Sequence, residues 1–463
     1  MGFEINNGKL ERYTEEDGIT DIIVPDGVTT IEEYAFTECL TIKSVTIPDS
    51  VKTISYSAFC LCSALETVVI GNGVSKIMDG AFLACEALKS VTFGNKVKLI
   101  DECAFQECTS LEEIVLPDSV TKIGRTAFLK CTSLKKVKIP EGLTKISEDA
   151  FYGCTSLKTF HIPAAVKTIG EDAFKDCTSL EAVTVDENNE KYFEISGVVY
   201  SKNQIVFVPA GIEVVEIPEF VTMLKPWAFA YCTSLTKVIV PAGVKKIDEC
   251  AFYENPNLHD VIVDPNNEKY CDIDGVLYDK NVKKLVYCPQ AKESIIIPDT
   301  VTTILDSALC DCCHLTSIII PDSVKKIGEC AFCYLTSLTS LKIGKNVTDI
   351  QASGFQGCKA LKSVDLPKKL TKISWLMFAW CESLKEIIIP KNVTVIEKQA
   401  FKNCSSLTRV VIPESVTEIG EEAFSGCDSL NEIVLAKGTE QITIPVTNLD
   451  NEKWQEIRGK YGL

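Results

Sequence analysis

Cysteine is the residue with the greatest capacity for chemistry in this 463-residue chain, which holds 22 cysteines and three histidines. Thiols can pair as disulfides, ligate zinc as thiolates or act as nucleophiles. Two short stretches concentrate them, because CDCC at 310–313 stands directly before His314, and Cys330 and Cys333 have the C-x-x-C spacing. These side chains could supply zinc ligands, or they could be packing residues of an interior.

The positions of the cysteines favour packing. Thirteen of them lie three residues after a recurring, mostly aromatic position, and Asn255 and Leu335 occupy the same slot in two further copies. The thirteen are Cys39, Cys62, Cys85, Cys108, Cys131, Cys154, Cys177, Cys232, Cys312, Cys358, Cys381, Cys404 and Cys427. A slot that accepts Cys, Leu and Asn indicates a small inward-facing site and not a covalent requirement.

Neighbours in this column would stand about 4.8 Å apart, which is within reach of a disulfide, but their parallel Cα–Cβ bonds suit the required dihedral angle poorly. We therefore expect free, buried thiols that act as small hydrophobes, as in a reducing compartment. The two local stretches fit the same scheme, because Cys312 belongs to the column and Cys330 shares its slot with Cys103 and Cys250. The sequence therefore predicts no metal site.

The remaining residues form no recognisable catalytic set. None of His161, His259 and His314 has an obvious serine or carboxylate constellation around it, and His161 is expected to be a surface residue of a strand. The chain has no phosphate-binding loop, no G-x-G-x-x-G and no H-E-x-x-H. We therefore predict a protein that is not an enzyme and has no cofactor.

The net charge and the hydropathy of the chain limit which partners and which cellular location are expected. A formal net charge of −17 argues against nucleic acid, because phosphates need a basic face. The chain has no run of about 18 apolar residues, so no membrane insertion is expected. The segment MGFEINNGKLERYTEEDG is polar and lacks the apolar core of a signal peptide. As the sequence stands we expect a cytoplasmic protein; the alternative is a cell-surface or secreted one, if a signal peptide has been removed.

The elements that position the cysteines come from an internal repeat. A marker residue returns every 23 residues, usually as the dipeptide Ala-Phe, and two gaps of 55 and 57 residues break the rhythm. The fifteen markers are Phe36, Phe59, Phe82, Phe105, Phe128, Phe151, Phe174, Phe229, Phe252, Leu309, Phe332, Phe355, Phe378, Phe401 and Phe424. No single copy can bury its own apolar side, so stacked copies are needed for a continuous core.

One copy shows how each coil is built. In LEEIVLP the apolar residues Leu111, Ile114 and Leu116 have the spacing of a leucine-rich repeat strand, and the proline that follows ends the strand. SVTKIG then directs Val120 and Ile123 inward as a second short strand, and AFQEC forms a tight helical turn that inserts the phenylalanine into the core. The predicted fold is a β-rich solenoid of 23-residue coils in fifteen copies, with short helical turns, two internal β-hairpin insertions and capped ends.

The stretch LPDSVTKIGRTAFLKCTSLKKVKIP at 116–140, repeated with variation over nearly the whole chain, resembles the BspA-like (treponemal-type) leucine-rich repeat family. The resemblance implies a leucine-rich repeat solenoid. It also implies, as an expectation, a bacterial surface protein that binds host or matrix proteins.

The two gaps share the sequences VDENNEKY and VDPNNEKY, each followed by two apolar stretches joined by a polar turn. We expect a hairpin from 198–200 with 205–208, and another from 276–278 with 285–287. The aspartates and asparagines of these segments favour turns, although calcium binding is an alternative. Near the C-terminus, Asp450 is expected to cap a short helix that carries Trp454 and Ile457 and ends at Gly459.

These features divide the chain into seven segments. They are an N-terminal hairpin cap (1–24), a first block of repeats (25–185), a first hairpin insertion (186–217), a middle block (218–263), a second hairpin insertion (264–297), a third block (298–436) and a C-terminal cap (437–463). The caps are expected because the end coils would otherwise expose unpaired edges.

Because successive side chains of a strand point to opposite faces, one position in each longer strand is expected to point outward on the concave sheet. In stacked coils these positions form a column, and in the second half of the chain the residues of this column are unusually apolar. The candidate partner-binding residues of this column are Ile239, Ile262, Ile296, Ile319, Ile388 and Val411, and Trp375 and Trp380 form a candidate aromatic patch on the edge. An exposed apolar run usually marks a contact surface, although Val and Ile also suit strands without any partner. We expect noncatalytic binding of a protein partner or a second copy of the chain; the alternative is adhesin-like binding of a host matrix protein or a glycan.

Overall fold

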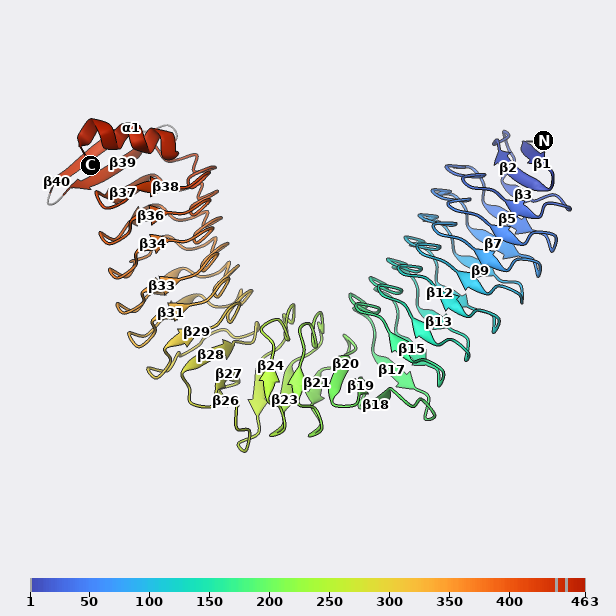
Figure 1. Cartoon of the computed structure of the whole chain (residues 1–463), viewed down its shortest axis with the longest axis horizontal. Helices are drawn as coiled ribbons and strands as arrows, with labels where there is room; N and C mark the ends of the chain where they lie inside the picture. Colours follow the sequence, from blue (N-terminus) through green and yellow to red (C-terminus); the bar gives the residue numbers. More distant parts are fainter. Residues whose placement is uncertain (1, 438–439, 446–448, 463) are drawn as a thin grey trace. The chain divides into compact units, whose positions relative to one another are not determined.

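Two columns of short parallel strands build the solenoid, and within each parallel sheet a strand pairs with the strand one coil further on. The computed structural model describes residues 2–437, 440–445 and 449–462. By their contacts they form two units, Met1–Glu213 with Ala228–Ser234, and Val214–Trp227 with Leu235–Leu463. Each unit has the same coil construction (Figure 1).

In the first unit, the longer strands are β3 (Asp21–Ile23), β5 (Ser44–Ile47), β7 (Thr67–Ile70), β9 (Ser90–Thr92), β11 (Glu113–Val115), β13 (Lys136–Lys138), β15 (Thr159–Ile162) and β17 (Ala182–Val185). The short strands of the second column are β4 (Thr30–Ile31), β6 (Thr53–Ile54), β8 (Lys76–Ile77), β10 (Leu99–Ile100), β12 (Lys122–Ile123), β14 (Lys145–Ile146) and β16 (Thr168–Ile169). Pairing is parallel at an offset of 23 residues, as in Glu113 opposite Lys136 and Ile114 opposite Val137. The predicted period is therefore the period of the backbone hydrogen bonds.

In the second unit, the longer strands are β21 (Val214–Glu216), β23 (Lys237–Val240), β25 (Asp260–Val263), β30 (Ser317–Ile319), β32 (Ser340–Lys342), β35 (Glu386–Ile388), β37 (Arg409–Pro413) and β39 (Glu432–Lys437). The short strands are β22 (Met223–Leu224), β24 (Lys246–Ile247), β29 (Thr303–Ile304), β31 (Lys326–Ile327), β33 (Asp349–Ile350), β34 (Lys372–Ile373), β36 (Val395–Ile396) and β38 (Glu418–Ile419). The segment around Ile296 is not a strand, but its coil still stacks in register, because Thr303 pairs with Lys326.

A third column, made of tight turns, carries the marker residues into the core. The backbone N–H of a marker donates to a carbonyl of the next coil at 2.7–3.0 Å, for example from Phe59 to Ala81. The marker rings stack in sequence, with centroids 5.5 Å apart between Phe105 and Phe128 and planes inclined by 1°. Both of these rings are fully buried. Offset stacking at this distance is favourable for aromatic pairs, so one ring per coil gives a continuous interior.

Each insertion is a three-stranded antiparallel sheet, β18 (Phe193–Ile195), β19 (Val198–Ser201) and β20 (Gln204–Phe207) in the first, and β26 (Tyr270–Ile273), β27 (Val276–Asp279) and β28 (Lys284–Tyr287) in the second. The sequence predicted only the last two strands of each. In the second unit β28 pairs in parallel with β29, so this insertion feeds directly into the ladder. The N-terminal hairpin of β1 (Phe3–Asn6) and β2 (Lys9–Tyr13) joins β4 in the same way.

The C-terminal segment contains β40 (Glu440–Pro445), antiparallel to β39, and helix α1 (Asn451–Tyr461). The side chain of Asp450 accepts a hydrogen bond from the backbone of Lys453, and Trp454 and Ile457 are buried as predicted. The helix does not stop at Gly459. It continues to Tyr461 and is capped by Gly462, which takes the left-handed conformation and donates to a carbonyl of the last turn. Residues 438–439, 446–448 and 463 of the predicted C-terminal cap lie outside the described residues.

Candidate functional site

Ten of the thirteen cysteines in the column form a ladder of sulfur–carbonyl hydrogen bonds. The thiol of Cys62 donates to the carbonyl oxygen of Phe36, 26 residues earlier, at 3.0 Å. Nine further thiols make the same bond at 3.1–3.3 Å; they belong to Cys85, Cys108, Cys131, Cys154, Cys177, Cys358, Cys381, Cys404 and Cys427. Each bond joins one coil to the coil before it. The thiols are therefore hydrogen-bond donors between coils, in addition to the small apolar groups that the sequence predicted.

Burial favours the protonated form of three of these thiols. It raises the pKa of Cys131, Cys177 and Cys358 to about 12 in each case. Since the thiolate is the nucleophile and the metal ligand, a raised pKa disfavours both roles for these three thiols near neutral pH. All 22 cysteines are free thiols.

One group of ligand atoms was not foreseen. Among residues 2–437, 440–445 and 449–462, the only three acidic, histidine or cysteine side chains whose ligand atoms all lie within 4.8 Å of one another are Glu141, His161 and Asp186. They come from three successive coils of the first unit, and Nδ1 of His161 lies 2.9 Å from the hydroxyl of Thr184. Such exposed groups are common without an ion, so we assign no metal here. The sequence feature that could have revealed this group is the 23-residue period, because it places residues about 20–25 positions apart next to each other.

The asparagine side chains in the turns of the two insertions are hydrogen-bonded to the backbone. The side-chain nitrogen of Asn267 donates to the carbonyls of Pro241 and Val244, and its oxygen accepts from the backbone of Lys269 and Tyr270, all at 2.8–3.0 Å. Asn189 makes the corresponding bonds in the first insertion. An amide oxygen that already accepts two N–H groups has little capacity left for calcium. The geometry favours turn stabilisation.

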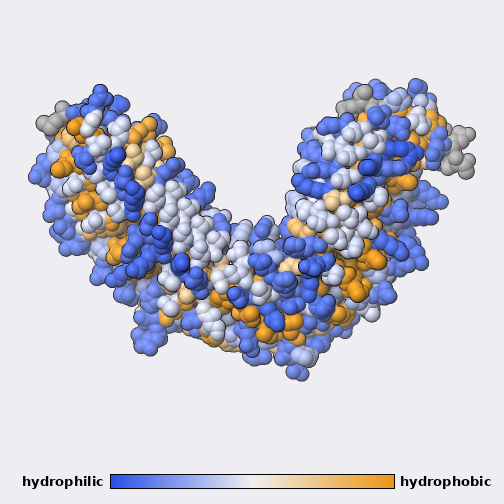
Figure 2. Space-filling view, turned by 180° about the vertical axis from the view of Figure 1, so that it is seen from behind, coloured by the Kyte–Doolittle hydropathy of each residue, from blue (hydrophilic) through white to orange (hydrophobic). Residues whose placement is uncertain are grey.

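The outward-facing apolar column of the second unit is exposed over part of its length. The exposed fraction is 90% for Ile296, 65% for Ile319 and 58% for Ile388, whereas Ile239 and Ile262 are half-buried. Hydrophobic residues also interrupt the hydrophilic surface in the space-filling view (Figure 2). The column includes the most exposed large hydrophobic residue of the described chain.

The expectation that Val411 is exposed is wrong. Its exposed fraction is 5%, and that of the next residue in the column, Val434, is 1%. Alternation fixes the face toward which a side chain points, but not what lies over that face. At this end β37 and β39 are longer than most strands of the column, and β40 extends the sheet. Local strand pattern could not reveal this burial.

The two candidate tryptophans lie on the turn edge in different surroundings. Trp375 is 45% exposed, and its indole nitrogen donates to the side chain of Gln399 at 3.3 Å. Trp380 is half-buried in a left-handed backbone conformation. In the described part of the chain, no ring contact joins the two. The aromatic patch therefore consists of separate side chains.

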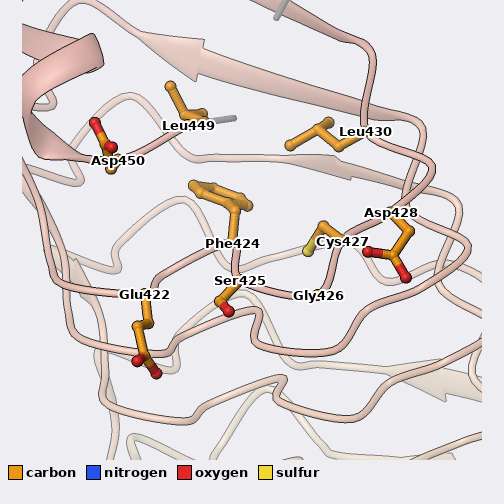
Figure 3. Close-up of a pocket in the computed structure, with 9 residues that line it drawn as sticks. All are labelled: Glu422, Phe424, Ser425, Gly426, Cys427, Asp428, Leu430, Leu449 and Asp450. Carbon is orange, nitrogen blue, oxygen red and sulfur yellow. The ribbon is translucent and has the colours of Figure 1, made fainter. Parts of the chain in front are cut away.

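A pocket of about 500 Å³ is lined by Phe424 (Figure 3), whose ring stacks on that of Phe401 with centroids 5.2 Å apart. Its apolar lining comes from Phe424, Cys427, Leu430 and Leu449, and carboxylates of Glu422, Asp428 and Asp450 stand around it. Residues 446–448, which precede Leu449 in sequence, lie outside the described residues. The pocket marks the place where the regular stacking of the core stops.

The repeat and its geometry identify the family. The model of the BspA-type leucine-rich repeat region matches residues 11–128, 98–196, 201–288, 280–408 and 333–446. The chain therefore belongs to the BspA-type leucine-rich repeat family. No curated protein matches it. Among the described residues, no helix has the length and apolar character needed to cross a membrane.

Several solved structures are similar to this chain. A leucine-rich cell surface protein from Faecalibacterium prausnitzii is 26% identical, with 95% of this chain and 93% of that chain covered and a TM-score of 0.45. A leucine-rich repeat protein from Bacteroides ovatus is 22% identical, with coverages of 93% and 91% and a TM-score of 0.44. The pneumococcal vaccine antigen PcpA is 19% identical, with coverages of 98% and 89% and a TM-score of 0.38.

The sulfur–carbonyl bond can be tested at Cys131, whose thiol donates to Phe105 at 3.1 Å. Cys131→Ser keeps a donor and Cys131→Ala removes it, so we expect the Ser variant to be more stable by about 1 kcal/mol. Urea unfolding followed by circular dichroism measures the difference. A sulfur that served only as apolar filling would give the opposite order, because Ser then buries an unpaired hydroxyl.

Burial of the ladder thiols also predicts a loss of stability at high pH. The folded pKa of Cys131 is raised to about 12, while an unfolded cysteine titrates near 8.5. Its contribution is fully present below about pH 8.5 and falls by about 1.4 kcal/mol per pH unit as the pH rises toward 12. Urea midpoints between pH 7.5 and 10 should show this fall, and Cys131→Ser should reduce its slope. Equal slopes for the two proteins would contradict the buried-thiol account.

Proposed function

We propose that this chain is a noncatalytic scaffold that binds a protein partner, or a second copy of itself, through the apolar sheet face of the second unit. The observation that supports this most is the exposure of Ile296, Ile319 and Ile388 at equivalent positions of their coils. Large exposed apolar patches on soluble proteins commonly mark contact surfaces.

The size of this surface fits a protein better than a small ligand. Ile296 and Ile388 are four coils apart, which corresponds to about 19 Å at one strand spacing per coil. Between them stand Lys342 and Asp365, which put one charge of each sign in the middle of the apolar column. A complementary face therefore needs apolar groups opposite the isoleucines and charges of opposite sign opposite Lys342 and Asp365.

The other candidate residues extend this surface in our proposal. Ile239 and Ile262 continue the column on β23 and β25 but are half-buried, so they contribute less area. Val411 is buried, so the exposed part of the column ends before it. Trp375 and Trp380 offer additional contacts on the edge, since tryptophans are frequent anchors of interfaces.

The alternative function is adhesin-like binding of a host matrix protein or a glycan at a cell surface. Trp375 favours it, because an exposed indole offers a flat apolar face together with a polar group. The free thiols favour a reducing compartment, and hence the cytoplasm, since thiols persist there. Counting reactive thiols in freshly isolated, denatured protein separates the two locations.

Replacing Ile296 and Ile319 together by Lys should weaken self-association or capture of a protein partner at least about tenfold, because two like charges then replace adjacent apolar contacts of the interface. Light scattering measures self-association, and affinity capture with mass spectrometry measures partner binding. Both positions are exposed, so the midpoint of thermal unfolding should stay nearly constant.

The matched control is Val69→Lys with Val115→Lys. These residues occupy equivalent outward positions on β7 and β11 of the first unit and are 44% and 49% exposed. The control should retain binding. Unchanged association of the Ile variant, or equal losses in both double variants, would remove the proposed surface. A protein that binds immobilised glycans and whose binding is lost in Trp375→Ala would support the alternative.

A further inference from the structure

Three thiols outside the buried ladder gather on neighbouring turns of the second unit. Cys310 and Cys333 each follow a marker residue, one coil apart, and the backbone N–H of Asp311 donates to the carbonyl of Cys333 at 2.9 Å. Cys330 lies in the same turn as Cys333. The ladder does not use these sulfurs, so they need a separate explanation.

The turn geometry brings Cys330 and Cys333 together. The backbone N–H of Cys333 donates to the carbonyl of Cys330 at 3.1 Å, which closes a tight turn across the pair. In such a turn the two Cα atoms lie within about 7 Å, near the range that a disulfide spans. The same two slots in another coil hold Asp172 and Lys175, whose charged groups meet at 3.0 Å. Side chains at these two positions therefore project to the same side of the turn.

The two sulfurs have different surroundings. Cys333 is 1% exposed and its thiol donates to the carbonyl of Ser353 at 3.0 Å, whereas Cys330 is only half-buried. The interaction with Cys333 lowers the pKa of Cys330, and Ser353 adds to this effect, although burial and the charges of Glu329 and Asp306 oppose it. Contacts with Cys310 and Cys330 and burial raise the pKa of Cys333. This asymmetry suits an attacking thiol and a resolving thiol.

We propose that Cys330 and Cys333 form a reactive dithiol that exchanges with low-molecular-weight disulfides and closes into an intramolecular disulfide. The Cys330 thiolate attacks one sulfur of the small disulfide, forming a mixed disulfide and releasing one small thiolate. Cys333 then loses its proton to solvent and attacks the sulfur of Cys330, which releases the second small thiolate. The protein loses two electrons and two protons, and the small disulfide is reduced to two thiols.

The chain contains its own control for this reaction. Cys103 occupies the same slot as Cys330 in a coil of the first unit, but Gln106 stands where a second cysteine would be needed. Its sulfur lies 3.1 Å from the hydroxyl of Thr126, and burial raises its pKa. A comparison of Cys330 with Cys103 therefore separates the effect of the paired thiol from the effect of the slot.

The test treats the folded full-length chain with oxidised glutathione at pH 7.5, stops the reaction with acid and maps the cysteines by mass spectrometry. In the natural chain we expect a bond between Cys330 and Cys333, formed at least about ten times faster than Cys103 is modified. Cys333→Ser should accumulate glutathione on Cys330, because nothing resolves the mixed disulfide. Cys330→Ser should react no faster at Cys333 than the natural chain does at Cys103.

Two results would overturn the proposal. One is modification of Cys330 at the rate of Cys103 in the natural chain, a comparison that requires no variant to fold. The other is a first-formed bond between Cys310 and Cys333, which would make Cys310 the attacking group. Neither result bears on partner binding by the sheet face, so the two proposals succeed or fail separately.

Discussion

The hydrogen bonds between equivalent residues of successive coils are the constraint on which this structure depends. Within each block of repeats they require the coils to advance the chain by the same 23 residues, as the pairing of Leu99 with Lys122 and of Ile100 with Ile123 shows. Once this register is set, each residue type repeats in a column along the unit. Phenylalanine then stacks on phenylalanine, and each thiol meets a carbonyl of the coil before it. Neither column could exist if one coil slipped by a residue, because a slip reverses the faces of its strands.

The same constraint governs the surface. A residue type that recurs at an outward position becomes a stripe several coils long, and this is how Ile296, Ile319 and Ile388 come to share one face of the second unit. Columns of opposite charge also arise, such as Glu112 with Lys135 one coil further on, at 3.0 Å. Exposed pairs of this kind contribute little stability individually. Exposed residues of this kind can change from coil to coil while the residues of the interior stay the same, and this property suits a binding scaffold.

The sequence predicted the features that follow from the period: the coil, the phenylalanine interior, the buried position of the ladder cysteines and the capped helix with Trp454. It could not predict features that depend on geometry between coils. Two such features are the hydrogen bonds donated by the thiols and the proximity of Glu141, His161 and Asp186. To predict them one must know which atoms face each other across neighbouring coils. The burial of Val411 depends on segments that strand alternation does not describe. The continuation of the helix through Gly459 to Tyr461 shows that a single interior glycine can be tolerated.

The most direct test of the register is to delete one coil. Removing residues 106–128 takes out 23 residues and joins Phe105 to Leu129, so every later residue of the first unit keeps its column. Removing residues 106–127 takes out one residue fewer and shifts the later coils out of register. The account predicts that the first variant gives a native-like circular dichroism spectrum and one cooperative unfolding transition in urea, whereas the second loses cooperativity. Equal disruption by both deletions would contradict it.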